Sequence, residues 1–260
     1  VEAVDCGVCI PAQTTRQSYD FTPEQKRSVR REEKKKKRLH RALARGQKGS
    51  RRREKKKRRL GRACEKIANI RKDFHHKTSK KLVEEADVVV FEDLRVSQMT
   101  KRPQPKYNEE TGKPERNGAR AKAGLNRAIL GVGWHQLYTF TKYKAFRAGK
   151  VSYKVRAHYS SQECADCHHT HPENRASQAN FVCQKCGHQE NADRNAARVL
   201  KQRAINLIMD SGTELSARGV LLAENGRGGA EQTQGANASC ASSYEASKMR
   251  VASATRSSVL

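Results

Sequence analysis

The sequence predicts an α/β protein, because strand-like apolar runs alternate with helical patterns and a compact cysteine module interrupts the last part of the chain. A first strand is predicted from Val1 to Ile10. A second, the strongest in the chain, runs from Val88 to Phe91 and is apolar throughout, as in strands covered on both faces. A short third strand is predicted over Val151 to Val155. Helices are predicted at about 24–45, 51–85, 125–148 and 192–209.

The composition is strongly basic, with 54 Lys and Arg against 27 acids and a formal net charge of +27 in 260 residues. The mean hydropathy of -0.92 argues against a large uniform core. Such a surplus of cations favours a polyphosphate partner. An acidic membrane is the rival partner, but no apolar run approaches the roughly 20 residues of a membrane span, and no signal peptide opens the chain. We expect a cytoplasmic, nucleoid-associated protein that binds nucleic acid and no membrane, although ribosomal and histone-like packing proteins share this composition.

Residues 24–85 are predicted to form a basic helical hairpin. Thr22 has the position of an N-cap, Pro23 is the first helical residue, and Gln25 completes a capping box. Between Glu24 and Lys81 there are 27 Lys and Arg against 6 acids. The second helix carries one apolar stripe, made of Leu60, Cys64, Ile67, Ile70 and Phe74. An antiparallel hairpin would be apolar inside and cationic outside. A merely solvated hairpin is the alternative, but charge of one sign favours contact with nucleic acid.

Two segments are predicted to lack regular structure. Residues 97–123 are polar and basic, with prolines and glycines spread along them, and are expected to form a mobile loop. Residues 210–260 are rich in Ser, Ala and Gly and have little periodicity, so a disordered tail is expected there.

The cysteine module predicts a zinc ribbon at 164–186. Cys164 and Cys167 form one C-x2-C pair, and Cys183 and Cys186 form a second pair after fifteen residues. Four thiolates at this spacing match structural Zn²⁺, which leaves no open coordination position for catalysis. Chance pairs of buried cysteines and an iron–sulfur cluster are the alternatives. The adjacent histidines are expected to lie outside the metal: His168, His169, His171 and His188.

The other four cysteines are expected to be inert. Cys6 and Cys9 are also a C-x2-C pair, but residues three apart on a strand point to opposite faces and cannot bind one ion together. Cys64 falls on the helical stripe and Cys240 in the tail.

Three acids in separate segments are the candidate catalytic residues. Asp5 lies within an apolar run, where a carboxylate is unfavourable unless it is paired or bound to a cation. Glu92 ends the Val-Val-Val-Phe strand, and Asp193 opens the last helix. Taken singly, Asp5 could pair with an arginine, Glu92 could mark a strand end, and Asp193 could cap a helix. Together they could bind two divalent cations that activate hydroxide and stabilise the leaving oxygen in phosphodiester cleavage.

These segments resemble the TnpB (OrfB) family. Val4-Asp5-Cys6-Gly7-Val8 resembles its first RuvC motif, Phe91-Glu92-Asp93-Leu94 the second, and Asp193-Arg194-Asn195-Ala196-Ala197 the third. The cysteine module, which lies between the second and third motifs, is similar to the zinc ribbon of the family. The helix that begins Leu125-Asn126-Arg127 is similar to the helix before the ribbon, and Gln47 to Arg53 resembles the link of the hairpin. The order and spacing agree over about residues 1–208.

The resemblance implies an RNase H-like (RuvC) fold, in which a mixed sheet with flanking helices covers 1–163 and 187–209 and the basic hairpin and the zinc ribbon are insertions. It further implies an insertion-sequence-encoded, RNA-guided DNA endonuclease, often labelled a transposase, with DNA and a guide RNA from the transposon end as partners. Asp5, Glu92 and Asp193 would bind catalytic Mg²⁺ or Mn²⁺, and Asp93 would point away. The basic residues of the hairpin link and two residues of the third motif would bind nucleic acid: Lys48, Arg51, Arg52, Arg53, Lys55, Arg194 and Asn195.

The sequence departs from the family pattern in two informative ways. Members of the family carry an N-terminal wedge and recognition domain, which contacts the guide RNA and recognises the short DNA motif beside the target. This domain is expected to be missing from this chain. A fragment, a decayed gene copy and a separately encoded half would each account for that. In addition, His168 stands after the second ribbon cysteine, where the family usually has glycine.

Two other classes of function compete with the endonuclease. A non-cleaving zinc-ribbon protein would bind nucleic acid whether or not its acids were intact. A DDE-type transposase would join strands itself, but the spacing of the acids fits RuvC better.

Overall fold

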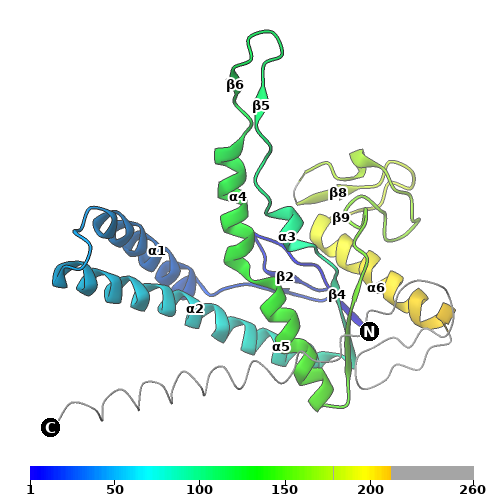
Figure 1. Ribbon diagram of the computed structural model, residues 1–260. Coiled ribbons are helices and arrows are strands. Elements are labelled where there is room, and N and C mark those ends of the chain that lie inside the picture. The colour runs from blue at the N-terminus through cyan, green and yellow to red at the C-terminus, as the bar shows by residue number, and fades with distance from the viewer. Residues whose placement is uncertain (178, 212–260) are drawn as a thin grey trace. The chain divides into compact units, whose positions relative to one another are not determined.

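The computed structural model describes residues 1–177 and 179–211 (Figure 1). From residue 212 onward, the tail predicted at 210–260 lies outside the described residues. None of the helices in the described part combines the length and apolar character that a bilayer-spanning helix needs. The architecture is α/β, as the sequence predicts.

The main sheet contains three parallel strands in the order β1-β4-β7, which are Glu2–Val4, Val88–Glu92 and Val151–Val155. The central strand β4 pairs with β1 through Ala3↔Val90 and Val4↔Phe91, and with β7 through Phe91↔Lys154 and Glu92↔Val155. The second and third strands predicted from the sequence are therefore confirmed.

The first predicted strand is wrong in length, because β1 ends at Val4 and not at Ile10. Asp5 makes one antiparallel bridge with Gln13, and their backbone N–H and C=O groups pair at 2.8 and 2.9 Å. Gly7 sits in the turn that follows, where a Cβ would lie 2.6 Å from the carbonyl oxygen of Ile10. The bridge joins β1 to a small antiparallel pair, β2 (Ala12–Gln13) and β3 (Ser18–Tyr19).

Helices cover both faces of the sheet (Figure 1). One face packs against α2 (Arg51–Glu85) and α5 (Trp134–Arg147), and the other packs against α6 (Ala192–Ser211). Alternate strand residues supply the two cores. The α2/α5 core contains Val4, Ala12, Tyr19, Phe74, Leu82, Val89, Phe91 and Leu137. The α6 core contains Ala3, Val90, Val151, Tyr153, Val155, Leu200 and Ala204.

Helix α1 (Pro23–Ala44) and α2 pack side by side as the predicted hairpin (Figure 1). The capping box is confirmed, because Gln25 N donates to Thr22 Oγ1 at 3.2 Å and Thr22 N donates to Gln25 Oε1 at 3.0 Å. The place of Cys64 in the buried stripe is wrong, since Cys64 is exposed. The residue that α2 buries at this point is Ala63, one position before Cys64, and Ile67 is buried one turn later.

The loop predicted at 97–123 is more ordered than expected. It contains α3 (Val96–Met99), a hairpin of β5 (Lys106–Tyr107) with β6 (Pro114–Glu115), and the start of α4 (Ala119–Val132). The single helix predicted at 125–148 is wrong as well, because Gly133 separates α4 from α5 with a left-handed φ of 78°. A Cβ on Gly133 would lie 3.1 Å from His75 Cε1, so the break also allows close packing on α2.

The ribbon region contains a 3₁₀ turn at Pro172–Asn174 and an antiparallel pair of β8 (Asn180–Val182) with β9 (Gln189–Asn191), and β9 leads directly into α6.

A buried carboxylate on β1 ties three segments together. Glu2 is 3% exposed, accepts a hydrogen bond from Thr15 N at 2.8 Å, and pairs with Lys201 Nζ of α6 at 3.4 Å. We predict that Glu2→Ala lowers the free energy of unfolding by about 2 kcal/mol, because it leaves the Thr15 N–H without its partner. Urea unfolding measures this. Glu84→Ala removes an exposed pair with Lys80 and should stay within about 0.5 kcal/mol of the wild type; equal losses in the two variants would contradict the prediction.

Candidate catalytic and zinc sites

The sheet brings Asp5 and Glu92 to one place. Strands β1 and β4 are parallel, so their carboxyl ends lie at the same edge of the sheet, and the register Ala3↔Val90 continues to Asp5 and Glu92. Side chains two residues apart on a strand share a face. Ala3 and Val90 belong to the α6 core, so alternation places both carboxylates at the edge of that face, where Glu92 also lines a cavity beside α5.

Helix α6 brings the third acid. Asp193 is its second residue, and the side chain of Asn191 accepts the N–H groups of Asp193 and Arg194 at 3.1 and 3.2 Å. Asn191 therefore caps the helix, and the Asp193 carboxylate is not used as a cap. It lies 3.7 Å from the guanidinium of Arg175, which belongs to the ribbon.

The three acids interact electrostatically. Burial raises the pKa of Glu92 well above its usual range, and the hydrogen bond and charge of Asp5 and the charge of Asp193 raise it further; the Cys6 N–H, at 3.4 Å, opposes the shift. Burial and the charge of Asp5 raise the pKa of Asp193, while Arg175 lowers it. In the described part of the chain, no arginine forms an ion pair with Asp5. The edge of the sheet thus carries three carboxylates and little compensating positive charge.

Among the described residues, the three carboxylates do not form a group that could hold one metal ion together. Within 1–177 and 179–211, the four ribbon cysteines are the one group of three or more candidate metal-binding residues whose ligand atoms all lie within 4.8 Å of one another. Two cations about 4 Å apart are bound from several sides, so their ligands need not touch one another.

Asp93 points to the opposite face, as alternation requires. Its carboxylate lies 3.5 Å from Lys154 Nζ of β7, and that ammonium lies 4.8 Å from the centre of the Tyr138 ring. A cavity of about 300 Å³ opens beside these groups and is also lined by Glu92 and Trp134. Sequence reasoning missed this cavity, although alternation along β7 would have placed Lys154 on the α5 face.

Trp134 belongs to the core and does not form an exposed platform on which a base could stack. It is 7% exposed, and its indole N–H donates to the carbonyl of Gly7 at 3.0 Å.

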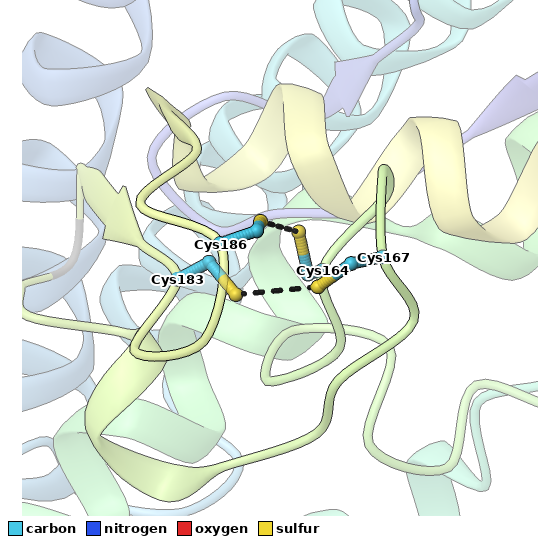
Figure 2. Close-up of side chains that lie close together, drawn as sticks. All are labelled: Cys164, Cys167, Cys183 and Cys186. Carbon is cyan, nitrogen blue, oxygen red and sulfur yellow. Dashed lines mark hydrogen bonds between the residues drawn. The ribbon is translucent and has the colours of Figure 1, made fainter.

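The four ribbon sulfurs converge (Figure 2). Cys164 Sγ lies 3.7 Å from Cys186 Sγ, and Cys167 Sγ lies 3.5 Å from Cys183 Sγ. A tetrahedral Zn²⁺ with Zn–S bonds of about 2.3 Å has sulfurs about 3.8 Å apart, so the donor set fits this ion. His168 Nδ1 hydrogen-bonds to the carboxylate of Glu163 at 3.2 Å, and His188 Nδ1 lies 2.8 Å from the carboxylate of Asp166.

The two cysteine knuckles have the same backbone geometry. The N–H of His168 donates to the carbonyl of Cys164, and that of Gly187 to the carbonyl of Cys183, both at 3.0 Å. Both donors are left-handed, with φ of 58° at His168 and 72° at Gly187. A left-handed residue follows each second cysteine, which explains the preference for glycine and leaves His168 strained.

The predicted cations of the hairpin link are accessible. Lys48, Arg51, Arg52 and Lys55 are exposed and Arg53 is half-buried. Sequence reasoning missed a larger cationic surface along α1, which lines a groove and consists of Arg27, Arg30, Arg31, Lys34, Lys37, Arg38 and Arg41. The acid Glu32 of α1 is buried toward α2, where it lies 3.4 Å from Lys66. A helical wheel of α1 would have shown this separation.

The prediction that Asn195 binds nucleic acid is wrong. Its side chain is fully buried, its Nδ2 donates to Glu163 O at 2.8 Å, and its Oδ1 accepts from Ala165 N at 3.0 Å. The amide is thus used inside the protein and is not accessible to a ligand. Arg194 is half-exposed and pairs with Glu190 at 3.2 Å, so its contact with nucleic acid stays a prediction.

We predict that His168→Gly stabilises the zinc-loaded protein by about 0.5–1 kcal/mol, because glycine adopts the left-handed conformation without strain. Thermal unfolding and zinc loss to a competing chelator both measure the effect. The reciprocal variant Gly187→His should destabilise the second knuckle by about 1 kcal/mol. A less stable His168→Gly protein would contradict the argument.

The raised pKa of Glu92 predicts a pH dependence of stability. A carboxyl whose pKa is higher in the folded state stabilises the fold below its unfolded pKa of about 4.3, and this contribution is lost as pH rises through the folded pKa. In zinc-containing buffer without Mg²⁺, Glu92→Gln should therefore be more stable than the wild type at pH 8, by on the order of 2 kcal/mol, and the difference should shrink toward pH 5. Urea unfolding from pH 5 to 8 measures this, with exposed Glu65→Gln as a flat control. A Glu92→Gln protein that is less stable at pH 8 would refute it.

Two family models match the chain. A model described as a probable transposase (OrfB_IS605) matches residues 2–103, and a model described as the Cas12f1-like TNB domain matches residues 134–200. The first match contains Asp5 and Glu92, and the second contains Asp193 and the ribbon.

Two curated relatives and one solved structure are also similar to parts of the chain. The putative RNA-guided DNA endonuclease InsQ of Escherichia coli (strain K12) is 42% identical over 171 residues, which cover 66% of this chain and 41% of the relative. The CRISPR-associated endodeoxyribonuclease Cas12f1 of Sulfoacidibacillus thermotolerans is 31% identical over 134 residues, 52% of this chain and 27% of the relative. The chain thus spans less than half the length of these relatives. A Cas12f1–sgRNA–target DNA complex has 18% identity and a TM-score of 0.48, covering 76% of this chain and 48% of that chain.

The two family models follow one another along the chain and contain the three candidate acids and the four ribbon cysteines, and the InsQ match covers about two thirds of the chain. The chain is therefore similar to the OrfB_IS605 family over residues 2–103 and to the Cas12f1-like TNB domain over residues 134–200.

Proposed function

We propose that this chain is the nuclease and zinc-ribbon part of a transposon-associated, RNA-guided DNA endonuclease that hydrolyses DNA phosphodiesters with two divalent cations. The proposal rests on the β1/β4 register, which leads Asp5 and Glu92 to the carboxyl ends of neighbouring parallel strands, and on the electrostatic effect of Asp5 on Asp193 at the start of α6. The names of the curated relatives, both endonucleases, support it.

The sheet supports assignment to the RNase H-like (RuvC) fold. The described β1-β4-β7 sheet is all parallel and not mixed as expected, because the antiparallel pair β2–β3 forms a separate sheet that meets β1 only through the bridge between Asp5 and Gln13. Helices flank both faces, and the hairpin and the ribbon are inserted between strands and before the last helix.

The acid site fits Mg²⁺ or Mn²⁺, because carboxylates such as Glu92 and Asp193, whose pKa is raised by burial and by a neighbouring carboxylate, are stabilised by a cation with oxygen ligands. Asp5 and Glu92 would hold the cations from the sheet, and Asp193 from α6. When bound, the cations supply an activated water and stabilise the leaving oxygen. The carboxylates fix the position of the reacting phosphate by holding its counter-ions, and Arg175 keeps the Asp193 side chain turned toward the ribbon side of the site.

The hairpin supports DNA and a guide RNA from the transposon end as partners. The cationic groove of α1 and the exposed residues of the hairpin link, including Arg51 and Arg52, offer a surplus of positive charge, with Glu54 in the link as the acid among them. Binding through such a surface releases counter-ions and weakens steeply with salt.

Cleavage of single-stranded and plasmid DNA with Mg²⁺ tests the proposal. We expect the wild type to cleave, and Asp5→Ala, Glu92→Ala and Asp193→Ala each to lose about 100-fold or more, because each removes a cation ligand. Asp93→Ala is the matched control and should retain activity, since Asp93 lies on the opposite face.

The same experiment separates the enzyme from a non-cleaving binder. The cationic groove of α1 consists of α1 side chains alone and includes none of the three acids, so it would bind DNA without them. Equal cleavage by the wild type and all three acid variants would refute the catalytic assignment. Salt-dependent binding by every variant, with no Mg²⁺-dependent cleavage by any, would leave only the binder.

A further inference from the structure

Asn195 connects the zinc ribbon to the first turn of α6. It lies two residues after Asp193, and its amide bonds to Glu163 O and Ala165 N, the residues on either side of Cys164. Cys164 is itself fully buried and is one of the four converging thiols. The first cysteine knuckle is therefore hydrogen-bonded to the helical turn that carries Asp193.

The second half of the ribbon reaches the same turn through the backbone. Strand β9 runs directly into α6, and the N–H of Ala192 donates to the carbonyl of Ala179 at 2.8 Å. The side chain of Ala192 completes the small ribbon core, which otherwise consists of Cys164, Phe181 and Cys183. The start of α6 is thus part of the hydrophobic core of the ribbon.

The rest of α6 is anchored separately. Leu200 and Ala204 pack in the sheet core, so the body of the helix has apolar support that does not involve the ribbon. The first turn of a helix has N–H groups without partners inside the helix and frays unless other groups hold it. At this helix, those groups come from the ribbon and its junction, through Asn191, Asn195 and the Ala192 N–H.

We propose that Asn195 is a positioning residue that makes the geometry of the acid site depend on the folded, zinc-bound ribbon. It holds the first turn of α6 on the Cys164 knuckle and so keeps the Asp193 carboxylate near Asp5 and Glu92. This inference rests on the proposed role of Asp193 as a ligand of the divalent cations.

The test measures binding of Mn²⁺ to the zinc-loaded chain by electron paramagnetic resonance, which needs no guide RNA or cleavage. Mn²⁺ does not displace Zn²⁺ from four thiolates, because it is the weaker binder of the two. Loss of a group that orients a metal ligand typically weakens affinity 10- to 100-fold. We expect Asn195→Ala to raise the Kd for Mn²⁺ by at least about 10-fold while retaining one zinc per chain by elemental analysis.

Arg198→Ala is the matched control. Arg198 also joins α6 to the ribbon, through Asp166 at 2.7 Å and Glu190 at 3.2 Å, but it lies further along the helix and is partly exposed. We expect it to change the Kd for Mn²⁺ by less than about 3-fold. Equal weakening in both variants would show that any loosening of the ribbon has this effect and would overturn the specific role of Asn195.

A measurement on the wild type keeps the inference testable if Asn195→Ala does not fold. Coupling between two sites is reciprocal. Adding Mg²⁺ should therefore slow hydrogen exchange of the peptide that contains the Ala165 amide, in the wild type but not in Asp193→Ala. Unchanged exchange in the wild type would overturn the inference.

Asp193→Ala distinguishes a failure of the proposed role of Asp193 from a failure of the coupling through Asn195. If Asp193→Ala binds Mn²⁺ as tightly as the wild type, the proposed role of Asp193 fails. If Asp193→Ala weakens binding and a zinc-loaded, folded Asn195→Ala does not, only the coupling fails.

Discussion

The register of β1 against β4 is the constraint on which the candidate site depends. A slip of one residue would turn Asp5 to the opposite face and separate it from Glu92. Apolar side chains bury on both faces, with Val89 and Phe91 on one and Val90 on the other, so any slip would place the wrong residues in both cores. Burial of each such side chain contributes about 1.5–3 kcal/mol. That is enough to hold two carboxylates together, although burial and the neighbouring Asp5 raise the pKa of Glu92.

Local signals predicted the elements that form through local interactions. The Val88–Glu92 strand, the capping box of Thr22 with Gln25 and the four ribbon cysteines each follow from residues close in sequence. The ends of strands and helices were harder to predict. Apolar residues continue past Val4, where β1 ends, although Gly7 already lies in a turn. Gly133 interrupts a helical pattern in the same way, and the need for it comes from His75, far away in the sequence.

In the candidate site, too, features set by nearby residues could be predicted, whereas those set by distant residues could not. Alternation and parallel pairing were sufficient to expect Asp5 near Glu92 and Asp93 on the opposite face, once the strands were assigned. The buried role of Asn195 could not be predicted, because its partners lie about thirty residues away in the segment that carries Cys164. The resemblance assigned Asn195 to nucleic-acid binding because it belongs to the same motif as the candidate catalytic acid Asp193. The cationic face of α1 was accessible to sequence reasoning, since it needs only helical periodicity and the observation that Glu32 falls on the opposite side.

The ribbon and the acids have opposite energetic roles. The position of the Asp193 carboxylate is unfavourable without cations, because burial and the charge of Asp5 both raise its pKa. The ribbon has only a few buried apolar side chains, so a metal must supply most of its folding free energy. Because Ala192 belongs to that small core and Asn195 bonds beside Cys164, the free energy of metal binding also fixes the start of α6. A structural ion can in this way hold a carboxylate in an unfavourable position, ready for a second kind of ion that relieves the repulsion.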